Sequence, residues 1–129
     1  MKGKTHAVGG LITAAATIGI IKHYQLNLEL DTLDLFIGAF FGSLLPDIDH
    51  KKSMLGSILH LPVKHRTLTH SLLFLFVISI FVIQYELSLG SGLFLGIFSH
   101  LVLDMAGPKS NGIMLFYPSK KKYSFNHLP

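Results

Sequence analysis

The chain of 129 residues contains no cysteine, and this absence narrows the chemistry open to it. A disulfide framework and a thiolate metal site are both excluded, so any transition-metal ligands must be His, Asp or Glu. Eight histidines and seven acidic residues are present. A metal site built from imidazole and carboxylate groups therefore stays possible.

Charged residues are also scarce. They make up 14% of the chain, against 50% hydrophobic residues and a mean hydropathy of +0.52, whereas ordinary soluble domains carry about 25% charged residues. The length predicts a single domain, residues 1–129, and the composition indicates a membrane protein. The net charge of +4 could suggest nucleic acid, but the lysines form short clusters between apolar runs and no nucleic-acid motif is present. We expect membrane lipids as partners, and no nucleic acid.

Four segments contain no Asp, Glu, Lys or Arg: Ala7 to Ile21, Leu35 to Pro46, Ser71 to Tyr85, and Leu87 to Leu103. A spanning helix needs roughly 20 residues, so each predicted helix must extend into the flanking polar residues, which include the His and Asp motifs. The prediction is an all-α integral membrane bundle of four transmembrane helices. Residues Ser88 to Gly92 predict a tight turn between the last two helices. A buried soluble helical bundle is the alternative that the short apolar runs leave open.

The N-terminus resembles a signal peptide, because Lys2 and Lys4 precede an apolar stretch that contains three consecutive alanines. Cleavage after these alanines would discard His6 and leave only half of the first helix. We therefore expect the segment to be retained as a membrane helix.

Basic residues predict the orientation. Ten of the eleven lie before the first segment, between the second and third, or after the fourth, and only Lys22 lies on the other side. By the positive-inside rule, both termini and the central loop are cytoplasmic. We expect a multi-pass protein of the cell (inner) membrane.

Candidate metal ligands stand at the ends of the apolar segments, and the predicted topology brings them all to the cytoplasmic side. His6 precedes the first segment. The candidates that follow the second segment, precede or begin the third, and lie at the end of the fourth are Asp47, Asp49, His50, His65, His70, His100 and Asp104. Ionisable residues within membrane segments are expensive and indicate function. The sequence therefore predicts a metal site at the cytoplasmic helix ends.

These motifs also have simpler explanations. His100 and Asp104 are four residues apart and share a helix face, but a hydrogen-bonded couple between helices would show the same spacing. Asp47 and Asp49 follow Pro46, where a turn could aim both carboxylates. The alternative is a polar helix terminus, although two carboxylates at a helix C-terminus oppose the helix dipole. His65 and His70 can act together only if a helix cap separates them, and His6 could be a lone interfacial histidine.

Together the eight residues could hold two divalent ions, with some of them orienting an imidazole instead of binding. Zinc is the expected metal, with manganese as the other choice. Such ions lower the pKa of water and stabilise charge on a substrate. Arg66, beside the ligands, could bind a phosphate oxygen, so Asp49 and Arg66 are the candidate catalytic residues.

The Thr-His start, the Gly-Ser-Leu-Leu-Pro-Asp-Ile-Asp-His block, His-Arg-Thr-Leu-Thr-His-Ser and His-Leu-Val-Leu-Asp resemble the YdjM-like inner-membrane proteins, described as metal-dependent hydrolases. That family resembles, at a distance, the zinc-dependent phospholipase C and P1 nuclease group. The resemblance implies that the ligands include Asp47, His65, His70, His100 and Asp104. It also implies cleavage of phosphoesters.

Two functions remain open. The first is a membrane-bound hydrolase that cleaves a lipid-like phosphoester at the cytoplasmic surface. The second is a non-enzymatic membrane protein that binds or transports metal. Ligands at helix ends on one side favour the hydrolase, because transporters usually place their ligands near the bilayer midplane.

Overall fold

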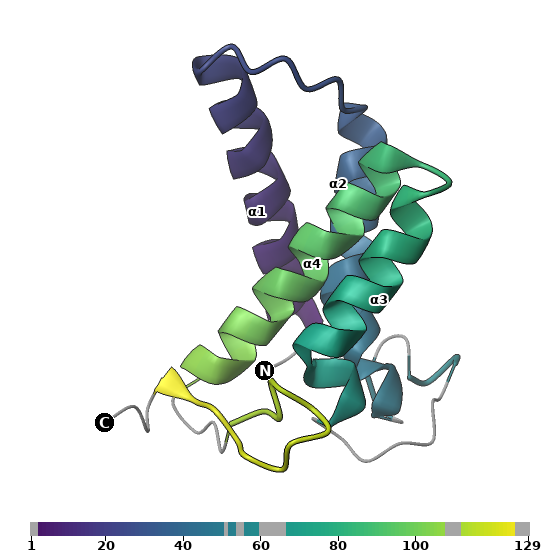
Figure 1. The fold of residues 1–129 in the computed structure, drawn as a ribbon, viewed down its shortest axis with the longest axis vertical. Helices are drawn as coiled ribbons and strands as arrows, with labels where there is room; N and C mark the ends of the chain where they lie inside the picture. The colour runs from purple at the N-terminus through teal and green to yellow at the C-terminus, as the bar shows by residue number, and fades with distance from the viewer. Residues whose placement is uncertain (1–2, 51, 54–55, 60–66, 108–111, 126–129) are drawn as a thin grey trace.

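The structure is a computed structural model, which describes residues 3–50, 52–53, 56–59, 67–107 and 112–125. Four α-helices dominate this part of the chain: α1 (Gly3–His23), α2 (Thr32–Leu44), α3 (Leu72–Ile83) and α4 (Leu87–Ala106), as Figure 1 shows. Two short 3-10 helices, η1 (Leu45–Asp49) and η2 (Leu68–His70), lie between α2 and α3. The expected all-α fold of four helices is confirmed.

Helix α4 is the centre of the bundle, because it contacts each of the other three helices. Its closest approach is to α2, where glycines face each other. A Cβ atom on Gly92 would lie 2.2 Å from the backbone oxygen of Leu35, and one on Gly38 would lie 2.3 Å from that of Leu89. Glycine is therefore required at both positions if the two backbones are to touch.

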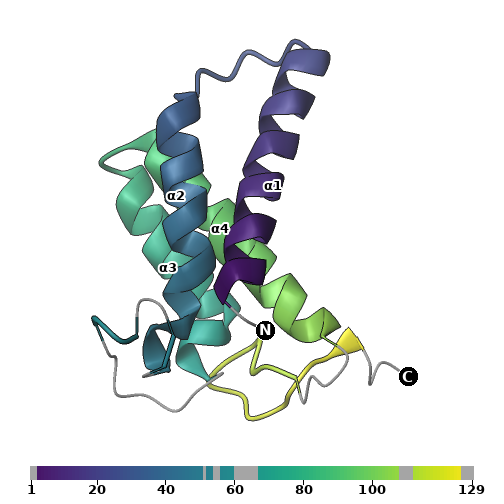
Figure 2. The ribbon, with the colours of Figure 1, turned by 180° about the vertical axis from the view of Figure 1, so that it is seen from behind.

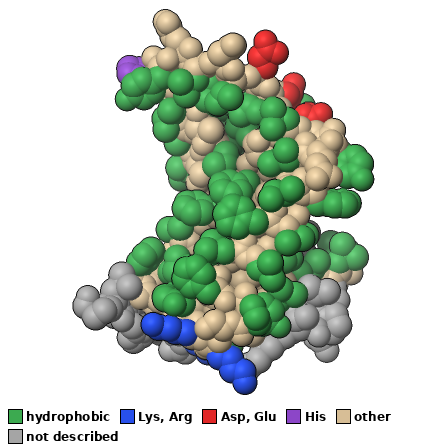
Figure 3. Space-filling view, viewed as in Figure 1, with side chains coloured by type: hydrophobic (Ala, Val, Ile, Leu, Met, Phe, Trp, Pro, Cys, Tyr) green, Lys and Arg blue, Asp and Glu red, His purple; other side chains and the backbone are tan. Residues whose placement is uncertain are grey.

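The two ends of the bundle differ in charge, as the space-filling view in Figure 3 shows. One end of the bundle holds the first residues of α1 and α3 and the last residues of α2 and α4. We call it the ligand end, because the predicted His and Asp ligands lie there. The opposite end carries Glu29, Asp31, Asp34 and Glu86, and we call it the acidic end. Helix α1 diverges from the other helices towards the acidic end (Figures 1 and 2).

The connection between α3 and α4 differs from the expected turn at Ser88 to Gly92. Helix α3 ends at Ile83 and α4 starts at Leu87, where the Glu86 carboxylate accepts a hydrogen bond from the Ser88 N–H at 3.2 Å. The glycines that suggested a turn lie inside α4. They are needed there for close contact, because a Cβ on Gly90 would lie 2.5 Å from the Ile83 backbone nitrogen.

Two helices, not the four expected, are long and apolar enough to cross a membrane. These are α1 with 21 residues and α4 with 20. Helices α2 and α3 have 13 and 12 residues, or about 20 and 18 Å, against a hydrocarbon core of about 30 Å. They are short because Pro46 ends α2 and Ser71 caps the start of α3, so the residues expected to extend them form η1 and η2 instead.

The outer surface between the two ends is apolar. Helix α3 reads Leu-Leu-Phe-Leu-Phe-Val-Ile-Ser-Ile-Phe-Val-Ile, with Phe76 and Phe81 about half exposed, and Ile12 on α1 is 63% exposed. In Figure 3 hydrophobic side chains fill the middle of the visible face. A helix that is apolar on all sides and only partly covered by protein fits a lipid environment.

Residues 112–125 fold back against the ligand end. Ile113 is fully buried beside Leu75, Ile97 and Leu101, and the Leu72 N–H donates to the Leu115 carbonyl at 2.9 Å. The segment holds one isolated antiparallel β-bridge, between residues 113 and 123. This segment is thus part of the folded structure around the predicted site.

Candidate metal centre

Three separate elements present the ligands. Pro46 lies in the first turn of η1, and its rigid ring fixes the tight turn that carries Asp47. His70 ends η2, directly before Ser71, whose hydroxyl accepts a hydrogen bond from the Phe74 N–H at 3.2 Å and starts α3. His100 and Asp104 lie one turn apart on α4, as their spacing predicts.

Four of the predicted ligands meet in one cluster: Asp47, His70, His100 and Asp104. Their ligand atoms all lie within 4.8 Å of one another. His100 Nε2 is 3.2 Å from His70 Nε2, 3.4 Å from Asp47 Oδ1 and 3.2 Å from Asp104 Oδ2. His70 Nε2 is 3.4 Å from Asp47 Oδ1 and 3.0 Å from Asp104 Oδ2. We call these four residues the ligand cluster.

The distances in the ligand cluster fit a tetrahedral metal ion. Zinc binds imidazole nitrogen and carboxylate oxygen at about 2.0–2.2 Å, so neighbouring ligand atoms of a tetrahedral site lie about 3.3–3.6 Å apart. Five of the six pairs within the cluster have distances of 3.0–3.4 Å. A cation at the centre would therefore reach all four ligand atoms with little adjustment.

Hydrogen bonds fix the tautomers of both imidazoles in the form a metal requires. His100 Nδ1 lies 2.5 Å from the Ser43 carbonyl oxygen, which can only accept, so Nδ1 carries the proton. The Thr69 hydroxyl donates to Asp49 Oδ2 at 2.6 Å and can therefore accept from His70 Nδ1, 3.2 Å away. In the neutral rings both Nε2 atoms then direct a lone pair into the ligand cluster.

Burial and charge also suit a cation. The side chains of His70, His100 and Asp104 are at most 2% exposed, and only Asp47 reaches 15%. Without an ion, burial alone would raise the pKa of the Asp47 carboxyl, but hydrogen bonds and charge from protonated His100 and His70 outweigh this effect and hold the pKa well below its usual range. A bound cation would take the place of these protons. Asp47 is thus ionised, and two buried carboxylates side by side need a positive partner.

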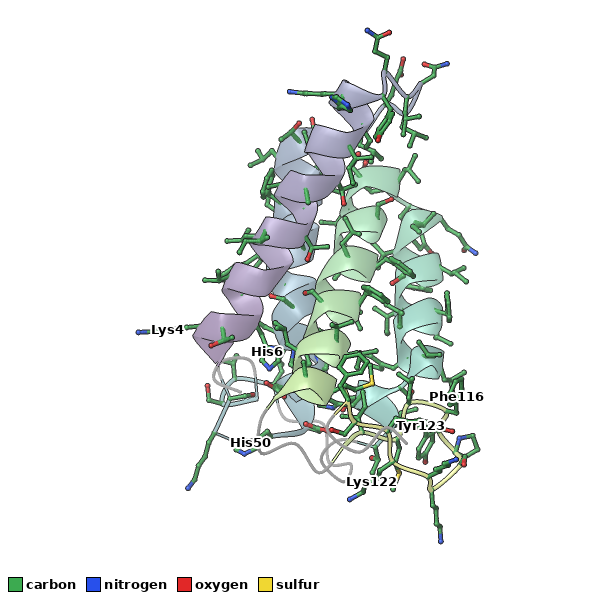
Figure 4. The ribbon with its side chains drawn as sticks, turned by 90° about the vertical axis from the view of Figure 1, so that its left-hand side faces the viewer. Lys4, His6, His50, Phe116, Lys122 and Tyr123 are labelled. Carbon is green, nitrogen blue, oxygen red and sulfur yellow. The ribbon has the colours of Figure 1, made fainter. Side chains whose placement is uncertain are left out.

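The other predicted residues lie around the ligand cluster or outside it. Asp49 is buried behind His70, linked through Thr69. His6 is buried and stacks on the His100 ring, whereas His50 is exposed and its Nδ1 accepts from the Lys52 N–H at 3.1 Å. Figure 4 shows His6 and His50 at the same end of the bundle. His65 and Arg66 lie outside the described residues.

Sequence reasoning missed two contributors, Thr69 and the Ser43 carbonyl. Thr69 orients His70 through a contact with Asp49, which lies in another segment of the chain, so the sequence around Thr69 gave no sign of this role. The Ser43 carbonyl is free to bind His100 because Pro46, three residues on, helps end α2 there. The proline after a helical run was the sole sequence feature that indicated open carbonyls at this end.

Comparison with known proteins agrees with the membrane-like surface. The profile of the YdjM inner membrane protein family matches residues 1–129. The chain is 34% identical over 128 residues to the uncharacterized protein YvsG of Bacillus subtilis (strain 168), covering 92% of this chain and 74% of YvsG. It is 31% identical over 137 residues to the inner membrane protein YdjM of Escherichia coli (strain K12), covering 91% and 67%. No solved structure matches. With the whole chain matched, it belongs to the YdjM inner membrane protein family.

Proposed function

We propose that this protein is a membrane-bound, metal-dependent hydrolase that cleaves a phosphoester of a lipid or lipid-like amphiphile. The observation that carries the proposal is the ligand cluster: four His and Asp ligand atoms within 4.8 Å of one another, three of them on buried residues, held at one end of an apolar bundle. The donor set of two imidazoles and two carboxylates fits zinc, and also manganese. When bound, such an ion lowers the pKa of water and stabilises negative charge on a phosphoryl group.

The protein residues divide into binding and positioning roles. Asp47 is the most exposed member of the ligand cluster, so substrate and water approach from its side. Thr69 and Asp49 orient His70, and the Ser43 carbonyl orients His100. Asp49, buried behind His70, is thus a positioning residue in this scheme, while Arg66 binds a non-bridging phosphate oxygen through its two-pronged guanidinium group.

The membrane position supports an amphiphilic substrate. The outer surface of α1, α3 and α4 between the two ends is apolar, and the ligand cluster lies at one end of it, so an apolar chain in the bilayer would bring its phosphate to the metal. An apolar groove of about 350 Å³ runs along α1 and α4, lined by residues that include Gly9, Phe98 and Leu103. A fully soluble substrate would gain nothing from this arrangement.

We place the ligand end and both termini on the cytoplasmic side. Lys4 and Lys122 lie at the ligand end in Figure 4, and Figure 3 shows blue basic side chains at this end and red acidic side chains at the opposite end. Helices α2 and α3 run between the same two ends as the longer α1 and α4. Single cysteines in place of Lys52 and Lys121 should be labelled from the cytoplasm, and one in place of Glu29 from outside. Labelling of position 52 from outside would contradict this orientation.

The hydrolase proposal is tested with purified, metal-loaded protein in mixed micelles. Short-chain and long-chain phospholipids and polyprenyl phosphates serve as substrates, and released phosphate or head group is measured. We expect release that a chelator abolishes and that Asp47→Asn, which removes one anionic ligand, reduces at least about tenfold. Metal-loaded protein that releases nothing across this panel, yet carries metal ions into liposomes, would establish transport instead.

A further inference from the structure

His6 has an environment that the ligand cluster does not explain. Its side chain, in the first turns of α1, is completely buried, and neither ring nitrogen makes a hydrogen bond to any residue that the structure describes. Buried polar groups are nearly always satisfied, and an imidazole without a partner in an apolar bundle is costly. Such a residue requires a ligand that hydrogen bonding does not supply.

The contacts of His6 show where this ligand would sit. Its Nε2 atom lies 3.2 Å from Asp104 Oδ1, but the pair lacks hydrogen-bond geometry. Its ring stacks on that of His100, with centroids 3.6 Å apart and planes 13° apart. His100 Nε2 in turn lies 3.2 Å from the other oxygen of the same carboxylate, Asp104 Oδ2. Two parallel imidazoles thus present their Nε2 atoms to the two oxygens of Asp104.

We propose that His6 Nε2 and Asp104 Oδ1 hold a second divalent cation, with Asp104 bridging it to the cation in the ligand cluster. Carboxylates commonly bridge paired metals, and two-metal sites place their ions about 3.5–4 Å apart. The stacked rings hold the two Nε2 atoms on the same carboxylate, one at each of its oxygens. Water and a phosphate oxygen of the substrate fill the remaining positions. The inference rests on the metal binding of the proposed function, and it makes the hydrolase a two-metal enzyme.

The alternative is that His6 is only a packing partner of His100, and the variant His6→Phe separates the two. Phenylalanine keeps an aromatic ring for stacking but supplies no nitrogen ligand. We measure metal content of the full-length protein in detergent after saturation with zinc and removal of loose ions. Wild type should hold two zinc ions per chain, His6→Phe and His6→Ala one, and His23→Ala, at the other end of the same helix, two.

Other zinc contents would contradict the second site, the proposed function or both. One zinc ion in wild type, or two in His6→Phe, would overturn the second site and leave the ligand cluster standing. No zinc in wild type would overturn the proposed function as well, whereas two ions without hydrolysis would overturn only the hydrolase. A helical circular dichroism spectrum and a monodisperse gel-filtration peak check the fold of each variant.

The distance between the ions is tested with manganese. Two Mn²⁺ ions bridged by one carboxylate at this spacing couple magnetically, so wild type should give the broad electron paramagnetic resonance spectrum of a coupled pair. His6→Phe should give the six-line spectrum of an isolated ion. Uncoupled spectra from wild type carrying two ions would place the second ion elsewhere and overturn the proposal.

Discussion

The two ends of this bundle are built on different principles. At the ligand end, the buried residues include His6, His70, His100, Asp49 and Asp104. At the acidic end, the charged residues lie on the surface, and the helices form an open apolar groove of about 430 Å³, lined by side chains that include Ile20, Leu35 and Phe94. The same four helices therefore pack without buried ionisable groups at one end. The polar cluster at the other end is not a requirement of helix packing, which points to function.

Between the two ends, close contact of α2 with α4 holds the bundle together through glycine. Gly38 and Gly92 lie where the backbones touch, away from the ligand cluster. Stability and metal binding should thus depend on different residues. The following changes test this separation, from the largest expected effect to the smallest.

The largest effect on stability is expected from Gly92→Ala. The new methyl group would lie 2.2 Å from the Leu35 backbone oxygen, so the two helices must separate. We expect a loss of about 3 kcal/mol in unfolding free energy, seen as a lower Tm in detergent. Gly19→Ala is the matched control, because nothing lies within 4 Å of its Cβ position, and it should be neutral or stabilising by up to about 1 kcal/mol. Equal effects of the two changes would contradict the helix contact.

An intermediate effect is expected from Thr69→Val, which keeps the side-chain shape but removes the hydroxyl between Asp49 and His70. Loss of an orienting partner typically weakens metal binding about 10–100-fold. Competition with a zinc-binding dye measures the affinity. Thr17→Val at the acidic end removes a hydroxyl that donates to the Thr13 carbonyl, and it should leave the affinity unchanged. Unchanged affinity in Thr69→Val would remove Thr69 and Asp49 from the site.

The smallest effect is expected from Asp31→Ala, which removes the N-cap of α2, where the Asp31 carboxylate accepts from the Asp34 N–H at 2.9 Å. The cost should be about 1 kcal/mol of stability with no change in zinc affinity. Ser71→Ala removes the cap of α3 at the ligand end and should cost a similar amount. Because Ser71 follows His70, that variant should also weaken zinc binding, and a difference in affinity between the two cap variants is the readout.

The sequence predicted the parts of this structure that local chemistry determines. The spacing of His100 and Asp104 places both on one face of α4, and Pro46 ends α2 beside Asp47, so three of the four members of the ligand cluster follow from short-range rules. Four helices and their approximate positions followed from the apolar segments.

The parts that depend on packing could not be predicted. The glycines of α4 resemble turn residues until α2 is placed against them, so the turn expected at Ser88 to Gly92 was wrong. Four membrane-spanning helices were expected, with the second and third extending into the residues that form η1 and η2. Instead, α2 ends before Pro46 and α3 begins after Ser71, so only two of the described helices, α1 and α4, are long enough to cross a membrane. The role of Thr69 depends on a contact with Asp49, twenty residues earlier in the chain.

The central claim, that the ligand cluster binds a divalent cation, is tested most directly by the zinc affinity of Asp104→Asn. This change keeps the side-chain size but removes the charge of the carboxylate that lies 3.0 Å from His70 Nε2 and 3.2 Å from His100 Nε2. We expect wild type and the control Asp34→Asn, at a partly exposed position of the acidic end, to bind zinc with equal affinity, whereas Asp104→Asn should bind it at least about 100-fold more weakly. Equal zinc affinity in all three proteins, with all three folded, would contradict the account.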